Sequence, residues 1–335
     1  MPGYPDNPVL FEYRRGGQAE SVHRGAYVVI AGEKVQEARG TVDHPYFLRS
    51  AAKLFQALSL VESGAAERFG LADAELALVC ASHNGEDVHA QTAASLLRKG
   101  GLSEADLLCG THPPFDGETA ARLRAAGEKL SPLRHNCSGK HGGMLLLAKH
   151  LGQPTSAYLD PQGPAQRRIR AVLCEVCGVF EKNCLPATDG CSAPTYAVPL
   201  RCLALGFARL TNPEGLRPGL SEACERVREA IAKNAYLFAG RKQLDTELAQ
   251  ASGGRILGKR GAEGVYGLGV CGDRAGIALK IDDGANRMHS FWIVSMLERR
   301  GLLRPGERQA LAPHLDPVQR NFAGLEVGEA RAIFS

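Results

Sequence analysis

The sequence predicts an α+β fold in which strands from both ends of the chain share one antiparallel sheet that helices cover. Three observations indicate this arrangement. Residues 8–40 and again 255–281 contain short β-branched or aromatic runs separated by glycine turns, whereas about 86–249 shows mainly helical periodicity. The terminal subregions, about 8–85 and 250–300, therefore supply the sheet, and the central subregion supplies most of the helices.

The N-terminal part is expected to begin with an antiparallel meander that includes strands Val9–Tyr13 and Tyr27–Ile30. A helix is predicted after Pro45, because apolar residues then recur at helical spacing as far as Gly64. The continuous apolar run Glu75–Ala81 is typical of a strand buried on both faces. These elements place the first polar motifs at a helix start and at a strand end.

The middle of the chain reads as a series of helices with glycine or proline between most of them. The expected helices are Ala90–Leu97, Glu118–Ala126, Gly143–Leu151, Pro164–Val176, Tyr196–Leu210 and Glu222–Asn234. A second meander follows, with predicted strands at 255–259, 265–270 and 276–281, and a final helix, Ala285–Arg299, closes the core.

Composition narrows the class of protein. The 335 residues are 44% hydrophobic and 23% charged, which is typical of a soluble globular chain. The net charge of +4 is small and its cations are scattered, which argues against nucleic-acid binding. Neither a signal peptide nor a membrane-spanning run is found, so a cytoplasmic protein is expected. The ten cysteines lie mostly in apolar segments, and we expect no disulfide framework.

The stretch Arg49-Ser50-Ala51-Ala52-Lys53 places a hydroxyl and an amine three residues apart on the predicted helix. Residues at that spacing share a face, so Lys53 as a neutral amine can take the proton of Ser50. The alternative is an ordinary exposed helix N-terminus, because Ser-x-x-Lys pairs also arise by chance.

A second polar stretch, Ser82-His83-Asn84-Gly85-Glu86, follows the apolar run that ends at Ala81. Polar residues just beyond a buried strand are a common place for a site, since the scaffold fixes them while the loop exposes them. The sequence equally permits a helix cap here, formed by Ser82 or Asp87.

Two further loops combine cysteine with other reactive side chains: residues 135–143 (HNCSGKHGG) and 188–195 (TDGCSAPT). Cysteines in polar loops beside His, Lys and Asp are candidates for nucleophiles or metal ligands, and thiolate with nitrogen suits zinc. Cys137 and Cys191 with one nitrogen ligand are such a set. A phosphate-binding loop at 138–140 is the alternative, although the full motif is absent. The pair Cys174 and Cys177 is predicted to be core packing.

Together these blocks resemble the asparaginase II family, the rhizobial-type or class 3 L-asparaginases. The resemblance covers nearly the whole chain and rests on the blocks 49–53, 80–83, 136–141, 188–191, 258–262 and 279–284. It implies a single catalytic domain over residues 1–335, a fold similar to that of serine β-lactamases and glutaminases, and a homodimer with zinc in each subunit. The implied reaction is hydrolysis of L-asparagine to L-aspartate and ammonia.

The resemblance also implies roles for individual residues. Ser50, Lys53, Ser82 and Lys259 match the family's catalytic residues. The positions of its zinc ligands are occupied by Cys137, Lys140 and Cys191, and Asp189 matches a site aspartate. A lysine must lose its proton to act as a base or to ligate zinc, which burial and a second ammonium nearby favour.

Several assignments stay open from sequence alone. Either Ser50 or Ser82 can be the nucleophile, and the helix N-terminus favours Ser50. Lys280 is an alternative to Lys259, although a strand lysine more often faces solvent.

The zwitterionic substrate needs a cation and an anion in its pocket. Arg49 and His83 are candidates for the cation, and Asp189 or Glu86 for the anion. The alternative functions are a glutaminase, a β-lactamase-like hydrolase of another amide, and a zinc-stabilised binding protein without catalysis.

Overall fold

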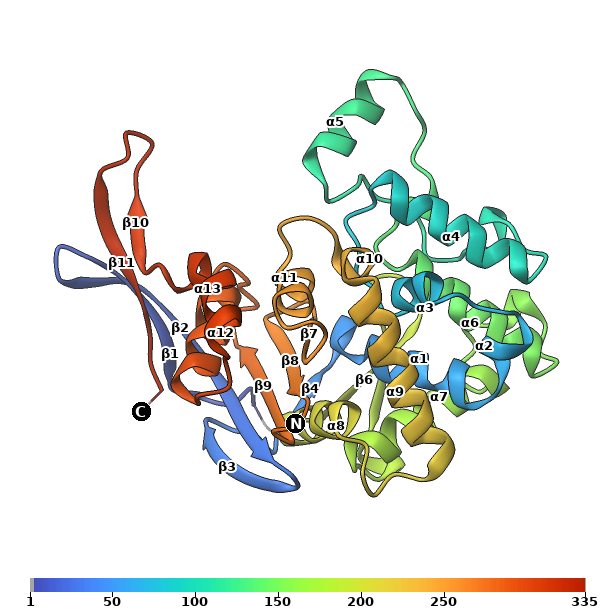
Figure 1. Ribbon diagram of the computed structural model, residues 1–335, viewed down its shortest axis with the longest axis horizontal. Coiled ribbons are helices and arrows are strands. Elements are labelled where there is room, and N and C mark those ends of the chain that lie inside the picture. The colour runs from blue at the N-terminus through green and yellow to red at the C-terminus, as the bar shows by residue number, and fades with distance from the viewer. Residues whose placement is uncertain (1–2, 335) are drawn as a thin grey trace.

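The computed structural model describes residues 3–334, and two sheets and a group of helices make up its architecture (Figure 1). Within this range eight strands form the main sheet, in the order β10-β11-β1-β2-β9-β8-β7 with β3 paired to β2. Its strands are β1 (Val9–Arg15), β2 (Gln18–Ala31), β3 (Lys34–Arg39), β7 (Ile256–Arg260), β8 (Val265–Val270), β9 (Ala275–Ile281), β10 (Val318–Arg320) and β11 (Glu326–Ala332). Every pairing is antiparallel. The expected sheet of N- and C-terminal strands is therefore confirmed.

The remaining elements are a small sheet and the helices. The small sheet has the order β4-β6-β5 and consists of β4 (Pro45–Phe47), β5 (Leu185–Thr188) and β6 (Pro194–Pro199). The helices are α1 (Lys53–Glu62), α2 (Ala65–Arg68), α3 (Asp73–Val79), α4 (Asp87–Lys99), α5 (Gly117–Ala125), α6 (Ser138–His150), α7 (Pro164–Cys177), α8 (Leu200–Thr211), α9 (Pro218–Lys233), α10 (Ala235–Ala239), α11 (Leu244–Ala251), α12 (His289–Arg299) and α13 (Pro305–Ala310).

Both faces of the main sheet are covered, and side chains that alternate along a strand enter the two cores in turn. On β2, Val28 and Ile30 join the core that α8 and the helical half share, whereas Tyr27 and Val29 face Trp292 of α12. Because neighbouring strand residues point to opposite faces, one strand contributes to both cores. Figure 1 shows the sheet and α12 on one side of the molecule and most helices on the other.

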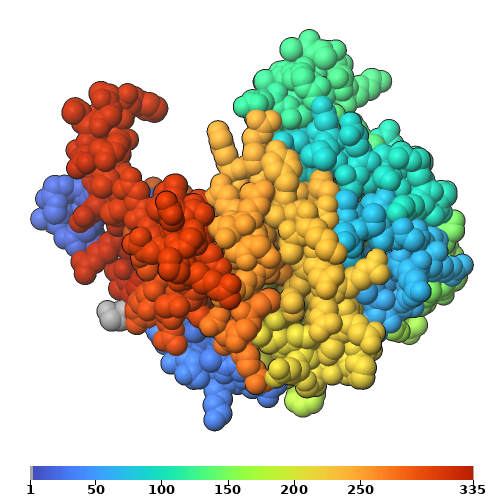
Figure 2. All heavy atoms as spheres, in the orientation of Figure 1, coloured from blue at the N-terminus to red at the C-terminus, as the bar shows by residue number. Residues whose placement is uncertain are grey.

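The space-filling view shows the surface hollowed between the C-terminal hairpin and the region around α5 (Figure 2). Among the described residues, no helix combines the length and apolar character needed to cross a membrane. All ten cysteines are free thiols.

Two predicted elements are wrong. Residues 75–81, expected to be a strand, belong largely to α3, whose start is capped because the Glu75 carboxylate accepts a hydrogen bond from the Ala72 N–H at 2.9 Å. A buried apolar run does not distinguish strand from helix, and α3 packs on α4, α6 and α9. The predicted helix Tyr196–Leu210 is divided, because its first residues belong to strand β6 and α8 begins only after Pro199.

The chain also continues beyond the last element that the sequence predicted. After α12, the short helix α13 leads into the hairpin β10–β11, and β11 pairs with β1 at one edge of the main sheet. The C-terminal hairpin therefore extends the sheet on the side away from the predicted site residues (Figure 1).

Candidate active site

Lys53, the first residue of α1, lies at the centre of the predicted catalytic group. It follows a single 3-10 turn, η1 (Arg49–Ala52), and is 1% exposed. Its amine nitrogen lies 2.9 Å from Ser82 Oγ, 2.6 Å from the Ala81 carbonyl oxygen and 3.1 Å from the Asn136 carbonyl oxygen. A buried amine needs partners for all its polar positions, and these three oxygen atoms supply them. The amine predicted to pair with Ser50 therefore contacts Ser82 instead.

Both serines line the same pocket, which has a volume of about 300 Å³. Its walls come from segments far apart in the sequence: Ser50, Ser82, Phe115, Asn136, Arg260, Gly261, Ala262 and Asn286. The fold thus brings the two predicted serines together, with Lys53 buried behind Ser82. An opening of this size accommodates a compact amide.

Arg260 is a pocket residue that the sequence analysis did not single out. It ends β7, and its guanidinium donates a 3.1 Å hydrogen bond to Gln243 Oε1. Asp245 accepts a hydrogen bond from the Arg260 backbone N–H, and within residues 3–334 the Arg260 side chain forms no ion pair. A guanidinium outside any ion pair at a pocket wall is suited to bind a carboxylate. The only available signal was its place beside Lys259.

The second predicted lysine, Lys259, is fully buried and paired with an acid. Its amine lies 2.5 Å from Asp245 Oδ2, and the hydroxyl of Tyr266 donates to Asp245 Oδ1 at 2.9 Å. Burial lowers the pKa of Lys259, and the charge of Asp245 opposes that shift. Lys259 therefore lies beneath the site, close enough to Lys53 for the two charges to interact. The alternative lysine, Lys280, lines a different cavity.

The predicted metal ligands converge at the start of α6. Cys137, Lys140 and Cys191 are each no more than 4% exposed, and the Lys140 amine lies 2.9 Å from the Cys191 sulfur. A hydrogen bond from the Cys191 thiol holds the pKa of Cys137 well below its usual range, and the nearby lysine charges act in the same direction. Burial opposes the charge of Lys140, but attraction to Cys137 and Cys191 raises its pKa.

These residues fit a zinc ion in the chemistry of their donor atoms, and the Lys140 amine already contacts the Cys191 sulfur. Among the described residues, no three His, Cys, Asp or Glu side chains are arranged to hold a metal, so a metal here requires Lys140 as a ligand. Two thiolates and one amine form a donor set that zinc accepts, provided that binding displaces the Lys140 proton.

The predicted substrate-binding residues are not in the 300 Å³ pocket. Arg49 Nε donates to Asp189 Oδ1 at 2.8 Å, so these two form an ion pair, and Arg49 lines a neighbouring cavity. His83 is fully buried, and burial lowers its pKa well below the usual value, which keeps the ring neutral. Its Nδ1 accepts a hydrogen bond from the Gly85 N–H, so its Nε2–H donates to Ser138 Oγ at 2.9 Å.

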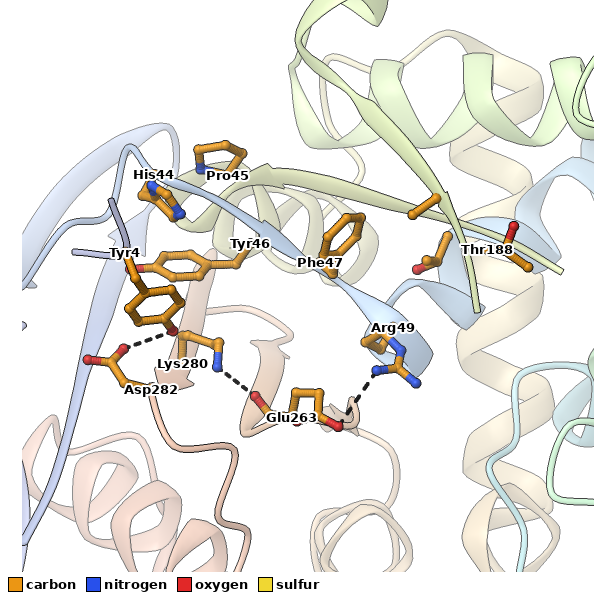
Figure 3. A pocket seen from close by; sticks show the side chains of 12 residues that line it. Tyr4, His44, Pro45, Tyr46, Phe47, Arg49, Thr188, Glu263, Lys280 and Asp282 are labelled. Carbon is orange, nitrogen blue, oxygen red and sulfur yellow. Dashed lines mark hydrogen bonds and ion pairs between the residues drawn. The ribbon is translucent and has the colours of Figure 1, made fainter. Parts of the chain in front are cut away.

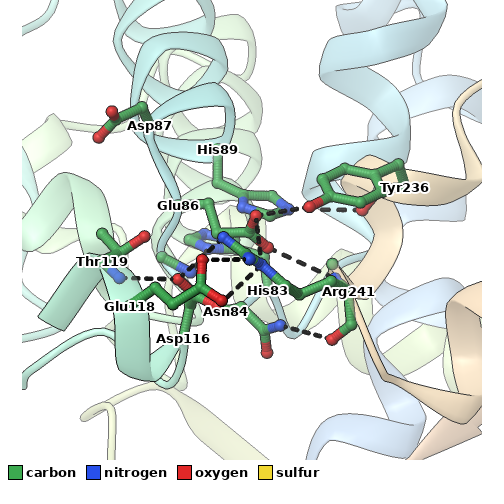
Figure 4. Close-up of polar contacts among 12 residues, drawn as sticks. His83, Asn84, Glu86, Asp87, His89, Asp116, Glu118, Thr119, Tyr236 and Arg241 are labelled. Atoms are coloured by element: carbon green, nitrogen blue, oxygen red, sulfur yellow. Dashed lines mark hydrogen bonds and ion pairs between the residues drawn. The ribbon is translucent and has the colours of Figure 1, made fainter.

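His83 and its neighbours instead hold the Ser82 loop in position (Figure 4). The His83 ring stacks on His89 with centroids 4.8 Å apart. The hydroxyl of Tyr236 donates to Glu86 Oε2 at 2.5 Å, and the Asn84 amide donates to the Arg241 carbonyl at 3.0 Å. These contacts tie the loop to α10 and the segment after it, which fixes Ser82 against Lys53.

Comparisons with known proteins place the chain in a family. A family model described as L-asparaginase II matches residues 11–332. No curated protein matches the chain.

Similar solved structures are distant. They include a β-lactamase from a Sulfitobacter species (16% identity, 87% of this chain and 92% of that chain, TM-score 0.41) and a D-alanine carboxypeptidase AmpC from Burkholderia cenocepacia (14%, 87% and 92%, TM-score 0.38). A third, Mglu, has 14% identity and a TM-score of 0.41, covering 86% of this chain and 60% of that chain. Similarities at this level indicate nothing about substrate. The family model spans nearly all of the described chain, and the protein belongs to the L-asparaginase II family.

Proposed function

We propose that this protein is an L-asparaginase that hydrolyses L-asparagine to L-aspartate and ammonia through a serine acyl-enzyme. Family membership supports an amidohydrolase of the asparaginase type. The observation that carries the mechanism is the 2.9 Å contact between the buried Lys53 amine and Ser82 Oγ at the pocket wall. A nucleophile and a base within hydrogen-bond reach are the minimum for covalent catalysis of this kind.

Ser82 is the proposed nucleophile. As a neutral amine, Lys53 directs two N–H groups at the carbonyls of Ala81 and Asn136, which leaves its lone pair for the Ser82 hydroxyl. Lys53 takes the hydroxyl proton while Oγ bonds to the side-chain amide carbon. It then returns a proton to the amide nitrogen, which departs as ammonia. Lys53 then takes a proton from water as the water oxygen attacks the ester carbon, and it returns that proton to Ser82 Oγ as aspartate leaves.

Ser50 and Arg260 are proposed to bind the substrate. The Ser50 hydroxyl lines the pocket with Ser82 and can donate to the oxygen that becomes negative during attack. The N–H of Ser82 is already bonded to the Phe238 carbonyl at 3.3 Å, so it is not the donor in this geometry. Arg260 would pair with the substrate α-carboxylate, and the side-chain oxygens of Asn136 and Asn286 are acceptors for its α-ammonium.

Zinc is proposed to bind Cys137, Lys140 and Cys191. When bound, it would join the start of α6 to the connection between β5 and β6 and so stabilise the structure beside the pocket. Removal of one thiolate tests this: Cys137→Ser should lower the zinc content measured by elemental analysis. Cys224→Ser, at a buried thiol of α9, is the matched control that should keep its metal. We further propose that the protein is a homodimer, which light scattering during gel filtration would test.

The decisive experiment is ammonia release from L-asparagine and L-glutamine by the purified protein, with hydrolysis of a penicillin measured in parallel. Ser82→Ala should reduce kcat for asparagine by about 10⁴-fold or more, as removal of a nucleophile does. Ser50→Ala should reduce it by about 10²–10³-fold, the effect of losing one oxyanion donor. Ser63→Ala, outside the pocket, is the control.

The other possible results of these assays would support a different nucleophile or a different function. A larger loss in Ser50→Ala than in Ser82→Ala would make Ser50 the nucleophile. Ammonia from glutamine alone would indicate a glutaminase, and cleavage of the penicillin alone a β-lactamase-like enzyme. A metal-loaded protein that binds asparagine without releasing ammonia would be a binding protein, and the proposed function would be rejected.

A further inference from the structure

A second cavity lies across Arg49 from the serine pocket, at the junction of the small sheet and the end of β9 (Figure 3). Its volume is about 510 Å³, within the range of small-molecule sites. One wall carries aromatic rings and the other carries charged groups. The lining residues are Tyr4, His44, Pro45, Tyr46, Phe47, Arg49, Ala187, Thr188, Thr195, Glu263, Lys280 and Asp282.

Lys280 is the charged group of this cavity that lacks a direct counter-ion. Contrary to the sequence expectation of a solvent-facing lysine, it is only 7% exposed. Its amine donates to the carbonyls of Glu263 and Ile281 at 2.7 and 2.6 Å, and among residues 3–334 it has no carboxylate oxygen within 4 Å. Burial lowers its pKa, and the more distant charges of Asp282, Glu263 and Asp283 oppose that shift. An anion in the cavity would therefore stabilise this ammonium.

The other charges at the cavity are already engaged. Arg49 pairs with Asp189 at 2.8 Å and with Glu263 at 3.8 Å. Asp282 Oδ1 accepts hydrogen bonds from Tyr4 and Asn7 at 3.2 and 2.9 Å. The carboxylates of Glu263 and Asp282 disfavour a strongly charged anion such as a phosphate dianion, so we consider a ligand that carries a single negative charge, placed on Lys280.

The opposite wall is suited to a flat apolar body. The rings of Tyr4, His44 and Tyr46 are mutual neighbours, with centroids 4.8 to 6.4 Å apart. Phe47 beside them is 44% exposed. Offset and edge-on ring contacts favour an aromatic ligand beyond the area it buries. Thr195 adds a buried hydroxyl for which the described residues supply no hydrogen-bond partner.

We propose that this cavity binds a small monocarboxylic acid with an aromatic body, its carboxylate on the Lys280 ammonium and its ring against Tyr4, Tyr46 and Phe47. The site is distinct from the Ser82 pocket and does not depend on asparagine hydrolysis. The ligand would lie against Arg49, whose neighbour Ser50 lines the serine pocket.

Calorimetric titration of the full-length protein with benzoate and with benzamide, its neutral isostere, tests the proposal. Benzoate should bind about tenfold or more tightly than benzamide, because only benzoate pairs with the ammonium. Lys280→Met should weaken benzoate binding by about the same factor and leave benzamide binding unchanged. Lys149→Met is the matched control, since that amine also donates to a backbone carbonyl, that of Gly100, but lies outside the cavity.

Phe47→Ala, at an exposed position that tolerates truncation, should weaken both ligands. This variant and the comparison of benzoate with benzamide on the wild type keep the test decisive if Lys280→Met does not fold. Ser82→Ala should leave benzoate binding unchanged, which separates this site from the proposed function. Equal affinity for the two ligands, no binding of benzoate, or benzoate binding that survives Lys280→Met would overturn the proposal.

Discussion

Asp245→Asn isolates the charge that holds Lys259 in the core. Asp245 and Lys259 are 4% and 0% exposed, and their side chains are 2.5 Å apart. Asparagine has nearly the same shape and keeps an oxygen that can accept the Tyr266 hydroxyl and the Arg260 N–H. The substitution therefore removes the negative charge and leaves most of the packing.

The expected loss of stability is large because neither partner is screened by water. Removing one member of a buried ion pair costs about 3–5 kcal/mol, a large part of the stability of an ordinary domain. The loss also depends on pH. Burial lowers the pKa of Lys259 and only Asp245 opposes it, so the variant's folded state favours the neutral amine. A cation with a depressed folded pKa gains stability as pH rises toward its unfolded pKa of about 10.4.

Urea unfolding followed by circular dichroism at pH 7 and pH 9.5 measures both effects. The difference between Asp245→Asn and wild type should be smaller at pH 9.5. Adding Lys259→Met should restore part of the stability at pH 7, since it removes the unpaired ammonium. Glu20→Gln, which breaks the exposed Arg15–Glu20 pair, should leave the midpoint unchanged. A loss below about 1 kcal/mol at pH 7, or a double variant less stable than Asp245→Asn, would refute the reasoning.

Three further changes have defined outcomes. Burial lowers the pKa of His289 to about 4. The neutral ring therefore stabilises the folded state fully above pH 6.5, and this stabilisation, on the order of 3 kcal/mol, is lost as the pH falls toward 4. In urea unfolding, the free energy of unfolding of His289→Leu should change less between pH 7 and pH 4.5 than that of the wild type. Gly139→Ala should destabilise by about 1–3 kcal/mol in the same assay, because an added Cβ would lie 2.1 Å from the Leu78 carbonyl oxygen. Steady-state kinetics of Arg260→Met should show a KM for asparagine raised about 10–100-fold, with Arg260→Lys intermediate; an unchanged KM would exclude Arg260 from carboxylate binding.

Hydrophobic pattern and turn residues predicted the main architecture, because those signals depend on local sequence. The N-terminal meander and the three strands at 256–281 appear close to where they were expected. The strand prediction for residues 75–81 was wrong for a tertiary reason. Other helices enclose α3, so its residues from Glu75 to Val79 are all buried and show no helical period. Proline at 199 marked the boundary that divides the predicted helix at 196–210.

The motifs identified the residues of the candidate site better than they identified its pairings. Ser50 and Lys53 have the right spacing for a local pair, but the buried amine is satisfied by Ser82 and by two carbonyls from distant segments. A rule based on sequence spacing cannot predict these contacts, because the residues that Lys53 contacts are 28 to 83 residues away in sequence. Arg260 was missed for a related reason, since the position of its guanidinium at the pocket wall, bonded to Gln243, is a property of the folded surface.

Asp245 is the counter-ion of the buried Lys259, and the fold rather than the local sequence determines that pairing. Lys259 lies in β7 and is fully buried, and a buried ammonium needs a counter-charge within a few ångströms. Any of the 36 acids in the sequence could have supplied this counter-charge, and no sequence pattern singled one out. The fold selects Asp245 because α11 packs on β7 and directs the carboxylate at Lys259. Lys280 is also buried, but among residues 3–334 it forms no ion pair, so we propose that a bound ligand supplies its counter-charge.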